Sequence, residues 1–545
     1  MVLLLGFLLA MSVTMALIPP LMRAAGYWQV LDQPSDRKVH TTPVPRVGGI
    51  AMAAGMLLAV VLWGNFAQPM PSLLAGVVVL LVFGVWDDRV TLGAAPKFLG
   101  QAIAVLLVML LGDVTIGTIT LDARHSLPPW LAQPLTFMFL LGVTNAINLA
   151  DGLDGLAGGT TLLSLGALAL LAFTAGNTFV APVAVFVTGA ILGFLRFNTH
   201  PARVFMGDSG SQILGFSAGV LAVVLTQDPA TPLSSALPLL LLGIPIIDTL
   251  MVMTQRMLQG RSPFHADRNH IHHRLLAFGL DHHEAVIIIY LLQASLFVLA
   301  WFMRFQSDLL IAAVFLLLAL AVIALLETGR ARAWRRGVAG QPAHKSAVRR
   351  AFDWLRAPDH IPRWSLWSIG ALTTCYLASV AWRCTAPVAD VRWLAAALGI
   401  ALCMTLVTRW SATEPSWFGK GALYICAVLA VYLDYWAETE PSRWSQAVLF
   451  GGLVLAVALR FRLTSDRRFR ITPLDILVVF AAAVIPNLPG SLAVPAGAGV
   501  SVGKLVVLFY GLETLFSSEG RSWRWASIGA LGFLAACVLE IGARL

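Results

Sequence analysis

The sequence predicts an all-α, polytopic membrane protein, and three observations lead to this fold class. Apolar residues make up 58% of the chain, whereas charged residues make up only 12%. Uninterrupted apolar runs of about 20 residues, the length that a helix needs to cross a bilayer, recur along the chain. The net charge of +9 reflects loops between these runs that are rich in arginine. Such loops are typical of the cytoplasmic side of a membrane, so the charge indicates a lipid bilayer as partner and no nucleic acid.

Eleven apolar runs fall within the first 330 residues, and we expect each of them to form a transmembrane helix. They lie near residues 2–20, 48–64, 72–86, 97–112, 130–147, 156–175, 178–197, 209–226, 234–255, 285–304 and 308–327. The first run has no basic start and no small-residue cleavage site, so we interpret it as a retained helix and not as a signal peptide. We therefore expect about 11 transmembrane helices in a core domain of residues 1–330.

Basic residues follow the alternation of the loops. If the helices alternate, one side holds the loops near 21–47, 87–96, 148–155, 198–208, 256–284 and 328–363, which carry nearly all the basic loop residues of the core. The positive-inside rule places this side in the cytoplasm and the N-terminus outside. Every core loop rich in Asp, Asn, His and Lys then falls on the cytoplasmic face, where these loops could build one site.

The chain continues well beyond this core. A basic segment at residues 331–363 predicts a cytoplasmic linker, and roughly six or seven further apolar runs predict an additional membrane domain at residues 364–545. The runs lie near 364–383, 391–408, 421–436, 445–460, 472–490, 500–516 and 525–543.

This additional domain contains no motif that we can connect to a reaction. Lys504 and Glu513 lie inside one apolar run and Asp475 near the start of another. They could form a functional pair, but a purely structural pairing is at least as well supported. All five cysteines lie in the C-terminal third and have no metal-ligand spacing, so we expect no cysteine chemistry.

Polar residues recur at every third position from the end of the fifth run to the start of the sixth: Asn145, Asn148, Asp151 and Asp154. On a helix this spacing places them along one face. Glycines at 152, 155, 158 and 159 allow backbone or ligand to come close. Acidic groups at a membrane surface are costly and therefore usually functional, although a polar helix end with a glycine cap is the alternative.

Adjacent carboxylates follow the third run. Asp87 and Asp88 could bind a divalent cation or act as a base, because two neighbouring acids repel each other and one is then poised to take up a proton. Lys97 before the next run offers a point charge for phosphate. The alternative is that the two acids form a solvated helix end.

A further acid, Asp208, lies between two glycines where the eighth run begins. A carboxylate on such a turn suits Mg²⁺, which binds few protein carboxylates together with substrate phosphate oxygens. Phe205 lies three residues earlier and could stack on a base. The alternative is that Asp208 or Ser209 caps the following helix.

Histidines and arginines gather after the ninth run, at Arg268, His270, His272 and His273. No Cys or Glu at suitable spacing completes a zinc site, and the basic flanks favour a phosphate-rich substrate. Asp281-His282-His283 downstream is interpreted as a solvated turn.

Lys38 and His40 in the first loop could contact an anionic ligand or lipid head group, and a plain positive-inside loop is equally compatible with this composition. Acids for a cation, a base, basic groups for phosphates and an aromatic side chain on one membrane face together indicate phosphoryl transfer to or from a lipid.

With these motifs in this order, the first 330 residues resemble the polyprenyl-phosphate N-acetylhexosamine-1-phosphate transferase superfamily (glycosyltransferase family 4). They are most similar to its bacterial undecaprenyl-phosphate N-acetylglucosaminyl-1-phosphate transferase branch. The phospho-N-acetylmuramoyl-pentapeptide transferase branch carries three consecutive histidines where this chain has His270-Ile271-His272-His273. The extension beyond residue 363 is not part of the family pattern.

The resemblance implies that a UDP-N-acetylhexosamine gives its sugar 1-phosphate to undecaprenyl phosphate, which yields the lipid diphosphate sugar and UMP. It further implies Mg²⁺, with Mn²⁺ as the alternative ion, and a role for each motif residue. Asp208 is expected to bind the metal with Asn148, and Asp87 to act as base with support from Asp88. The substrate-binding residues are expected to be Lys97 at the diphosphate, Asp151, Asp154 and Phe205 at the uracil, Arg268, His270, His272 and His273 at the sugar phosphate, and Lys38 and His40 at the lipid end.

The same resemblance implies a multi-pass protein of the bacterial inner membrane whose active site faces the cytoplasm and initiates a cell-envelope polysaccharide. GlcNAc is the first choice of sugar. The sequence leaves open the exact sugar, the polymer, the role of the extension, the oligomeric state (a homodimer is one option) and direct attack versus a phospho-aspartate intermediate. A transporter or flippase is the alternative function, but transporters hold polar groups near the bilayer midplane on broken helices.

Overall fold

The computed structural model describes residues 2–33, 43–262, 269–335, 360–383, 389–410, 416–435, 448–457, 498–516 and 522–539. These residues form two compact units, one with the described residues up to 335 and one with those from 360 on. Among them, nine helices are long and apolar enough to cross a membrane, eight in the first unit and one in the second. The prediction of an all-α, polytopic membrane protein is thereby confirmed, while the exact numbers of spans stay a prediction.

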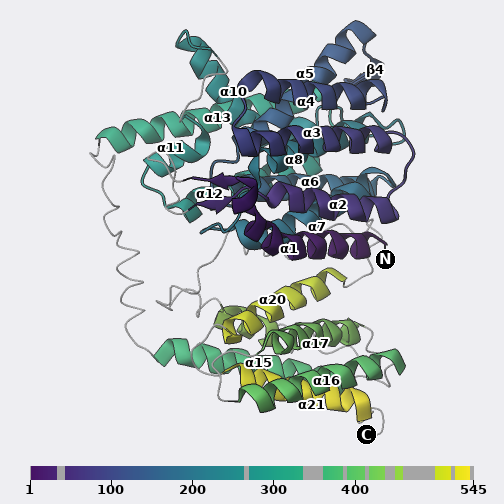
Figure 1. Cartoon of the computed structure of the whole chain (residues 1–545), viewed down its shortest axis with the longest axis vertical. Coiled ribbons are helices and arrows are strands. Elements are labelled where there is room, and N and C mark those ends of the chain that lie inside the picture. Colours follow the sequence, from purple (N-terminus) through teal and green to yellow (C-terminus); the bar gives the residue numbers. More distant parts are fainter. Residues whose placement is uncertain are drawn as a thin grey trace. The chain divides into compact units, whose positions relative to one another are not determined.

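The first unit consists of helices that lie side by side (Figure 1). They are α1 (Val2–Trp28), α2 (Gly48–Trp63), α3 (Met70–Val90), α4 (Ala94–Leu110), α5 (Pro129–Leu149), α6 (Leu156–Thr174), α7 (Val180–Asn198), α8 (Gly207–Gln227), α9 (Pro238–Leu241), α10 (Gly243–Leu258), α11 (Ile271–Ala277), α12 (His282–Met303) and α13 (Asp308–Arg335). Two short antiparallel pairs complete it: β1 (Leu31–Asp32) with β2 (Val44–Pro45), and β3 (Thr118–Thr120) with β4 (Arg124–Ser126).

Each predicted apolar run of the core coincides with helix, but the ninth differs in detail. The run at 234–255 forms two helices, α9 and α10, which meet at Leu242. Pro238 begins α9 and Pro245 lies in the first turn of α10. Proline lacks an amide hydrogen and restricts the residue before it, so one continuous helix is disfavoured here.

Helix α8 lies at the centre of the first unit and is buried along almost its whole length. Glycines let its neighbours approach closely: a Cβ on Gly49 of α2 would lie 2.3 Å from the Gly210 nitrogen, and one on Gly84 of α3 would lie 2.3 Å from the Ser209 Cα. Small residues at such crossings are how helices pack tightly inside a membrane. The first turn of α8 is therefore held firmly against α2 and α3.

Arg124 lies outside the loops that are expected on the cytoplasmic side. Its guanidinium donates hydrogen bonds to the carbonyl oxygens of Thr226, Asp228, Thr231 and Leu233, at and just beyond the last turn of α8. The Thr226 carbonyl lies in the last turn of α8, where carbonyls have no helical partners and carry the negative end of the helix dipole. Arg124 is therefore a structural cap for α8.

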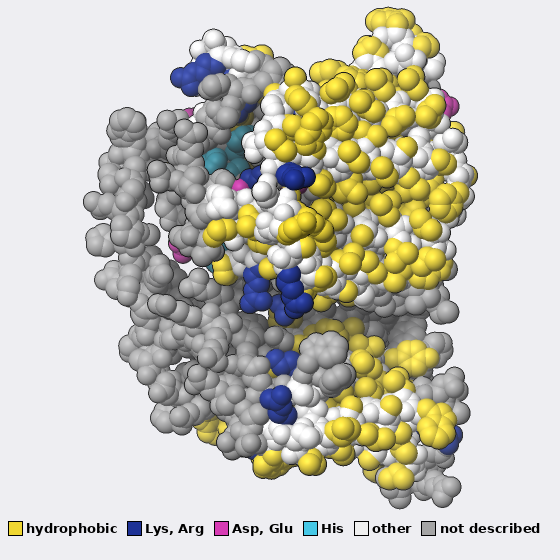
Figure 2. All heavy atoms as spheres, viewed as in Figure 1, with side chains coloured by type: hydrophobic (Ala, Val, Ile, Leu, Met, Phe, Trp, Pro, Cys, Tyr) yellow, Lys and Arg dark blue, Asp and Glu magenta, His cyan; other side chains and the backbone are white. Residues whose placement is uncertain are grey.

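Surface chemistry agrees with a membrane environment. In Figure 2 mainly hydrophobic side chains cover the broad face of the first unit, while basic, acidic and histidine side chains gather at one edge of that face. Large apolar side chains are exposed on several helices, among them Val82 on α3, Leu110 on α4 and Leu317 on α13. A soluble monomer rarely exposes so much apolar area, whereas lipid tails cover it at no cost.

The second unit contains α15 (His360–Arg383), α16 (Ala389–Arg409), α17 (Trp417–Tyr435), a helix at Val448–Val457, α20 (Ala498–Phe516) and α21 (Trp523–Leu539). Its core joins buried side chains from all of these helices, including Tyr376, Leu402, Leu453, Leu508 and Phe533. The predicted run at 472–490 lies outside the described residues. The predicted linker at 331–363 falls largely outside them too, and its separate role stays a prediction.

Candidate active site

Asp88 holds the first turn of α8 although it belongs to α3. Its Oδ1 accepts a hydrogen bond from the Asp208 N–H at 2.9 Å, and its Oδ2 accepts from the Ser209 N–H at 3.2 Å and from Ser209 Oγ at 2.9 Å. Free amide groups and the helix dipole make a helix N-terminus a favourable place for a carboxylate. Neither Asp208 nor Ser209 caps α8 with its own side chain, so that alternative interpretation is wrong.

The first residue of α8 must be a glycine. Gly207 has a φ of 70°, a left-handed conformation that side chains with a Cβ rarely adopt. A Cβ there would also lie 2.3 Å from Oδ2 of Asp88. The glycine thus lets the Asp88 carboxylate reach the start of α8, which sets the position of Asp208.

Asp87 precedes Asp88 near the end of α3 and pairs with Lys97. Nζ of Lys97 lies 2.6 Å from Oδ2 of Asp87 and 3.4 Å from Oδ2 of Asp208. The side chains of Asp87 and Asp208 also approach to hydrogen-bonding distance of each other. One lysine therefore lies against two carboxylates that come from positions 121 residues apart, as the sequence motifs predicted for a single site.

Asn148, near the end of α5, orients Asp208. Its Oδ1 accepts a hydrogen bond from Ser211 Oγ at 2.7 Å, and its side chain is hydrogen-bonded to Asp208. Because the Asn148 oxygen already accepts from Ser211, the amide group lies toward the Asp208 carboxylate. Its role as a direct metal ligand stays a prediction.

Asp151 and Asp154 occupy the loop between α5 and α6. Burial, together with the nearby carboxylates of Asp208 and Asp88, raises the pKa of Asp151 to about 7. Arg46 opposes this shift and also pairs with Asp32, so the first loop contributes a cation to the site that the motifs had not singled out. An acid surrounded by acids indicates a place where added positive charge would be stabilised.

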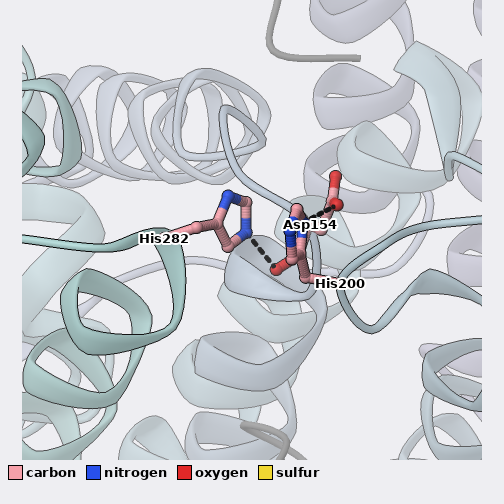
Figure 3. Close-up of side chains that lie close together, drawn as sticks. All are labelled: Asp154, His200 and His282. Carbon is pink, nitrogen blue, oxygen red and sulfur yellow. Dashed lines mark hydrogen bonds and ion pairs between the residues drawn. The ribbon is translucent and has the colours of Figure 1, made fainter. Parts of the chain in front are cut away.

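Burial disfavours the charged form of Asp154, but hydrogen bonds outweigh this effect and hold its pKa below the usual range. Oδ2 of Asp154 lies 2.6 Å from Nδ1 of His200 and accepts from the Ala202 N–H at 3.1 Å. Nε2 of His282 lies 3.3 Å from the Asp154 carbonyl oxygen (Figure 3). Asp154 is therefore ionised and fixed through one carboxylate oxygen.

These three residues are also the group of His, Cys, Asp and Glu side chains in the described part of the chain whose ligand atoms lie close enough, within 4.8 Å of one another, to hold a metal. The rings of His200 and His282 are stacked, with centroids 4.2 Å apart and planes inclined by 22°. Imidazole lone pairs lie in the ring plane, so nearly parallel stacked rings do not point at one ion. We interpret the group as a hydrogen-bonded support for Asp154.

The interpretation of residues 281–283 as a solvated turn is wrong. Asp281 caps α12 through a capping box with Glu284, while His282 and His283 pack against His200. The error arose because the partner, His200, is far away in the sequence and no local pattern marks it.

The histidine motif contacts a buried acid of α10, Asp248. Nδ1 of His270 lies 2.9 Å from Oδ2 of Asp248, and the Ile271 N–H donates to Oδ1 of Asp248 at 2.7 Å. A buried acid in an apolar run is usually functional, a signal that could have revealed Asp248 from sequence.

His272 links this motif to the α5–α6 loop. A Cβ on Gly152 would lie 2.3 Å from Nε2 of His272, so the loop and the imidazole are in direct contact. Burial, and then neighbouring His273, lowers the pKa of His272 to about 3. His272 is therefore neutral at physiological pH and can offer a hydrogen bond but no charge.

Phe205 joins the first loop to the start of α8: its N–H donates to the Pro45 carbonyl at 2.8 Å, and its carbonyl accepts from the Gly48 N–H at 2.9 Å. Its ring remains partly exposed. Lys38, His40 and Arg268 lie outside the described residues, so their predicted roles stay predictions.

Residues 70–226 match the model of glycosyl transferase family 4. The chain is 36% identical over 289 residues to a probable undecaprenyl-phosphate N-acetylglucosaminyl 1-phosphate transferase of Bacillus subtilis (strain 168), covering 53% of this chain and 81% of the relative. The chain belongs to this family. It is also 31% identical over 298 residues to an undecaprenyl-phosphate α-N-acetylglucosaminyl 1-phosphate transferase of Escherichia coli (strain K12), covering 53% of this chain and 81% of the relative.

A third relative is a decaprenyl-phosphate N-acetylglucosaminephosphotransferase of Mycobacterium tuberculosis (strain H37Rv), 35% identical over 301 residues, with 47% of this chain and 72% of the relative covered. These matches confirm the predicted family and its bacterial branch, and with them a membrane-embedded phosphotransferase. The family match lies within the first unit, where it spans α3 to α8 and so contains the carboxylates and Lys97.

Proposed function

We propose that the first unit transfers an N-acetylhexosamine 1-phosphate, GlcNAc 1-phosphate first among the candidates, from a UDP-sugar to undecaprenyl phosphate at the cytoplasmic face of the bacterial inner membrane. The observation that carries this proposal is that Lys97 lies against Asp87 and Asp208 while Asp88 holds the Asp208 backbone in place. The relatives are named as transferases of N-acetylglucosamine 1-phosphate to polyprenyl phosphates, which supports the same reaction here. The product would begin a cell-envelope polysaccharide.

The donor set fits Mg²⁺, with Mn²⁺ as the alternative ion. Asp208 would hold it, because a carboxylate that approaches a second carboxylate, Asp87, to hydrogen-bonding distance is stabilised by added positive charge. Bound Mg²⁺ would neutralise the phosphate oxygens and help the leaving phosphate depart. Asn148, which holds Asp208 from the side of α5, keeps that carboxylate in place.

Asp87 is the better candidate base, and direct attack is the better supported route. An oxygen of the lipid phosphate would form a bond to the β-phosphorus while the bond to the α-phosphate oxygen breaks, and Asp87 would accept the proton of the lipid phosphate. Both oxygens of Asp88 are engaged at the N-terminus of α8, so Asp88 could attack phosphorus only by releasing that helix. This argues against a phospho-enzyme at Asp88, whereas one at Asp87 remains the competing route.

The nucleotide would bind at the α5–α6 loop. His200 and the Ala202 N–H hold one oxygen of Asp154 and leave the other for the N–H of uracil. The partly exposed ring of Phe205 would stack on the base. His272, which is neutral, would bind the sugar phosphate by a hydrogen bond, together with His270, which Asp248 holds in place.

The test is an assay with purified full-length protein, undecaprenyl phosphate and a panel of UDP-sugars that includes the GlcNAc, GalNAc, QuiNAc and FucNAc derivatives. We expect UMP release and a lipid diphosphate sugar, detected by mass spectrometry, only when a divalent cation is present. Asp87→Asn should bind nucleotide within about threefold of wild type and yet turn over at least about 100-fold more slowly.

Absence of UMP with every donor would contradict the transferase proposal. Movement of a lipid-linked sugar across the bilayer without UMP formation would instead favour the transporter or flippase alternative. A sugar-phosphoryl enzyme trapped without lipid acceptor would overturn direct attack.

A further inference from the structure

The second unit contains a buried group of charged side chains that the transferase reaction does not use. Asp434 of α17 accepts from Nη2 of Arg383 at 2.6 Å, and its other carboxylate oxygen lies 2.7 Å from Nζ of Lys504. The hydroxyl of Tyr376 reaches the same oxygen at 3.3 Å. Among the described residues, the partner of Lys504 is thus Asp434, while the side chain of Glu513 lies outside them.

These charges do not balance. Among the described side chains, two cations, Arg383 and Lys504, face one carboxylate, so these three carry a formal net charge of +1. Only 2% of the Asp434 side chain, 13% of Arg383 and 11% of Lys504 are exposed. A net charge in such a low-dielectric place is costly and is usually a sign of function when it persists in a membrane protein.

One donor in the group has no acceptor in the described part of the chain. Nε of Arg383 donates to the Ser379 carbonyl and Nη2 to Asp434, but Nη1 is buried and has no hydrogen-bond partner there. A guanidinium nitrogen that reaches neither water nor an acceptor loses the hydration that it had in the unfolded chain. Both the charge excess and this donor would be satisfied by a second anion.

The position of the group favours a ligand that enters from one end of the unit. Arg383 is the last residue of α15, Asp434 is the next-to-last residue of α17, and Lys504 lies in the second turn of α20. Phe450 forms an apolar wall, with its ring 5.8 Å from Nζ of Lys504 and in edge contact with Tyr376. A planar fork, an ammonium group and an aromatic wall suit a phosphate group with several oxygens.

We propose that this end of the second unit binds a phosphate group between Arg383 and Lys504, with Asp434 as the resident counter-ion. The phosphate is carried by a lipid head group or is free in solution, and both share the chemistry that these side chains recognise. The proposal concerns the second unit alone and holds whatever the first unit transfers.

The test uses the full chain in phosphatidylcholine nanodiscs, with two probes: dioleoylphosphatidylglycerol, counted by native mass spectrometry, and inorganic phosphate, followed by calorimetric titration. Arg383→Gln and Lys504→Gln should each weaken binding of at least one probe about tenfold or more, because each removes half of the positive charge. Arg409→Gln, which removes an exposed cation at the end of α16, is the matched control and should leave binding within twofold.

A response of the lipid probe alone identifies a head-group site, and a response of both probes identifies a general phosphate site. If neither probe distinguishes wild type from Arg383→Gln and Lys504→Gln, the proposal is overturned. Arg383→Lys, which keeps the charge and lacks the fork, should recover part of the affinity and guards against a general folding defect. Asp434→Asn, where it elutes as a monodisperse particle, should bind phosphate several-fold more tightly, whereas unchanged binding would show that Asp434 and the ligand do not share the cations.

Discussion

The two units bury charges of opposite excess. In the described part of the first unit, the carboxylates of α3, α8 and the α5–α6 loop outnumber the cations Lys97 and Arg46. In the second unit, one carboxylate among the described side chains, Asp434, lies between Arg383 and Lys504. Both groups lie on helices that pack inside an apolar unit, where solvent screens charge weakly. The sign of the imbalance therefore predicts the ligand: a metal cation and its phosphates in the first unit, an anion in the second.

The comparison also separates two ways of holding a charge in place. Asp88 is stabilised by the amide groups at the start of α8, so it needs no cation of its own. Asp434 is stabilised by two full positive charges. A carboxylate of the first kind can keep its geometry when a metal arrives, because its partners are backbone groups that do not move.

The largest expected effect is on turnover in the first unit. Asp208→Asn removes a negative charge beside Lys97 while it preserves shape, so turnover should fall by at least about 10³-fold and lose its dependence on divalent cations. UMP release measured against Mg²⁺ concentration tests this. Asp113→Asn makes the same chemical change at an exposed position with a φ of 54°, which Asn adopts readily, and should leave turnover unchanged. Retained activity in Asp208→Asn would refute the metal assignment.

The sequence alone predicted where the helices form and that the polar motifs lie close together. Apolar length predicted where helices form because burial in lipid requires both an apolar surface and satisfied backbone groups. It could not predict pairings across long separations. Asp88 caps a helix that begins about 120 residues later, and His200 meets His282 across 82 residues. No local spacing records such contacts.

Two other residues carried a signal that was available. Asp248 and Asp434 are acids inside predicted apolar runs, and each holds a basic or histidine side chain in the structure. The rule that charged residues in apolar runs are functional was applied to Lys504 and Glu513. Lys504 lies against Asp434, and the side chain of Glu513 lies outside the described residues, so its pairing with Lys504 stays a prediction. Arg46 gave no such signal, because its loop is basic for reasons of topology as well.

The next effect tests whether the histidine motif must lie against the α5–α6 loop. In Gly152→Ala the new Cβ would lie 2.3 Å from Nε2 of His272, which is buried and has little room to retreat. A displacement of about 1 Å in a substrate-binding group costs about 100-fold in turnover, and we expect a loss of that order. Gly142→Ala in α5, where a Cβ meets nothing within 4 Å, is the matched control and should turn over normally. Equal activity of the two variants would show that this contact does not position the motif.

The smallest expected effect concerns the protonation of His272, a buried base of the first unit that carries no charge. The folded chain holds the pKa of His272 at about 3, against 6.5 for a free imidazole. Below pH 6.5 the unfolded chain therefore takes up a proton that the folded chain does not, and the free energy of unfolding should fall by about 1.4 kcal/mol per pH unit down to about pH 3. His272→Asn lacks this proton, so between pH 6.5 and 5 its unfolding midpoint in detergent should fall less than that of wild type, by a few degrees. The exposed His125→Asn is the control and should follow wild type. Parallel curves for wild type and His272→Asn would mean that His272 becomes protonated in the folded protein, and its role as a neutral hydrogen-bonding group would then be untenable.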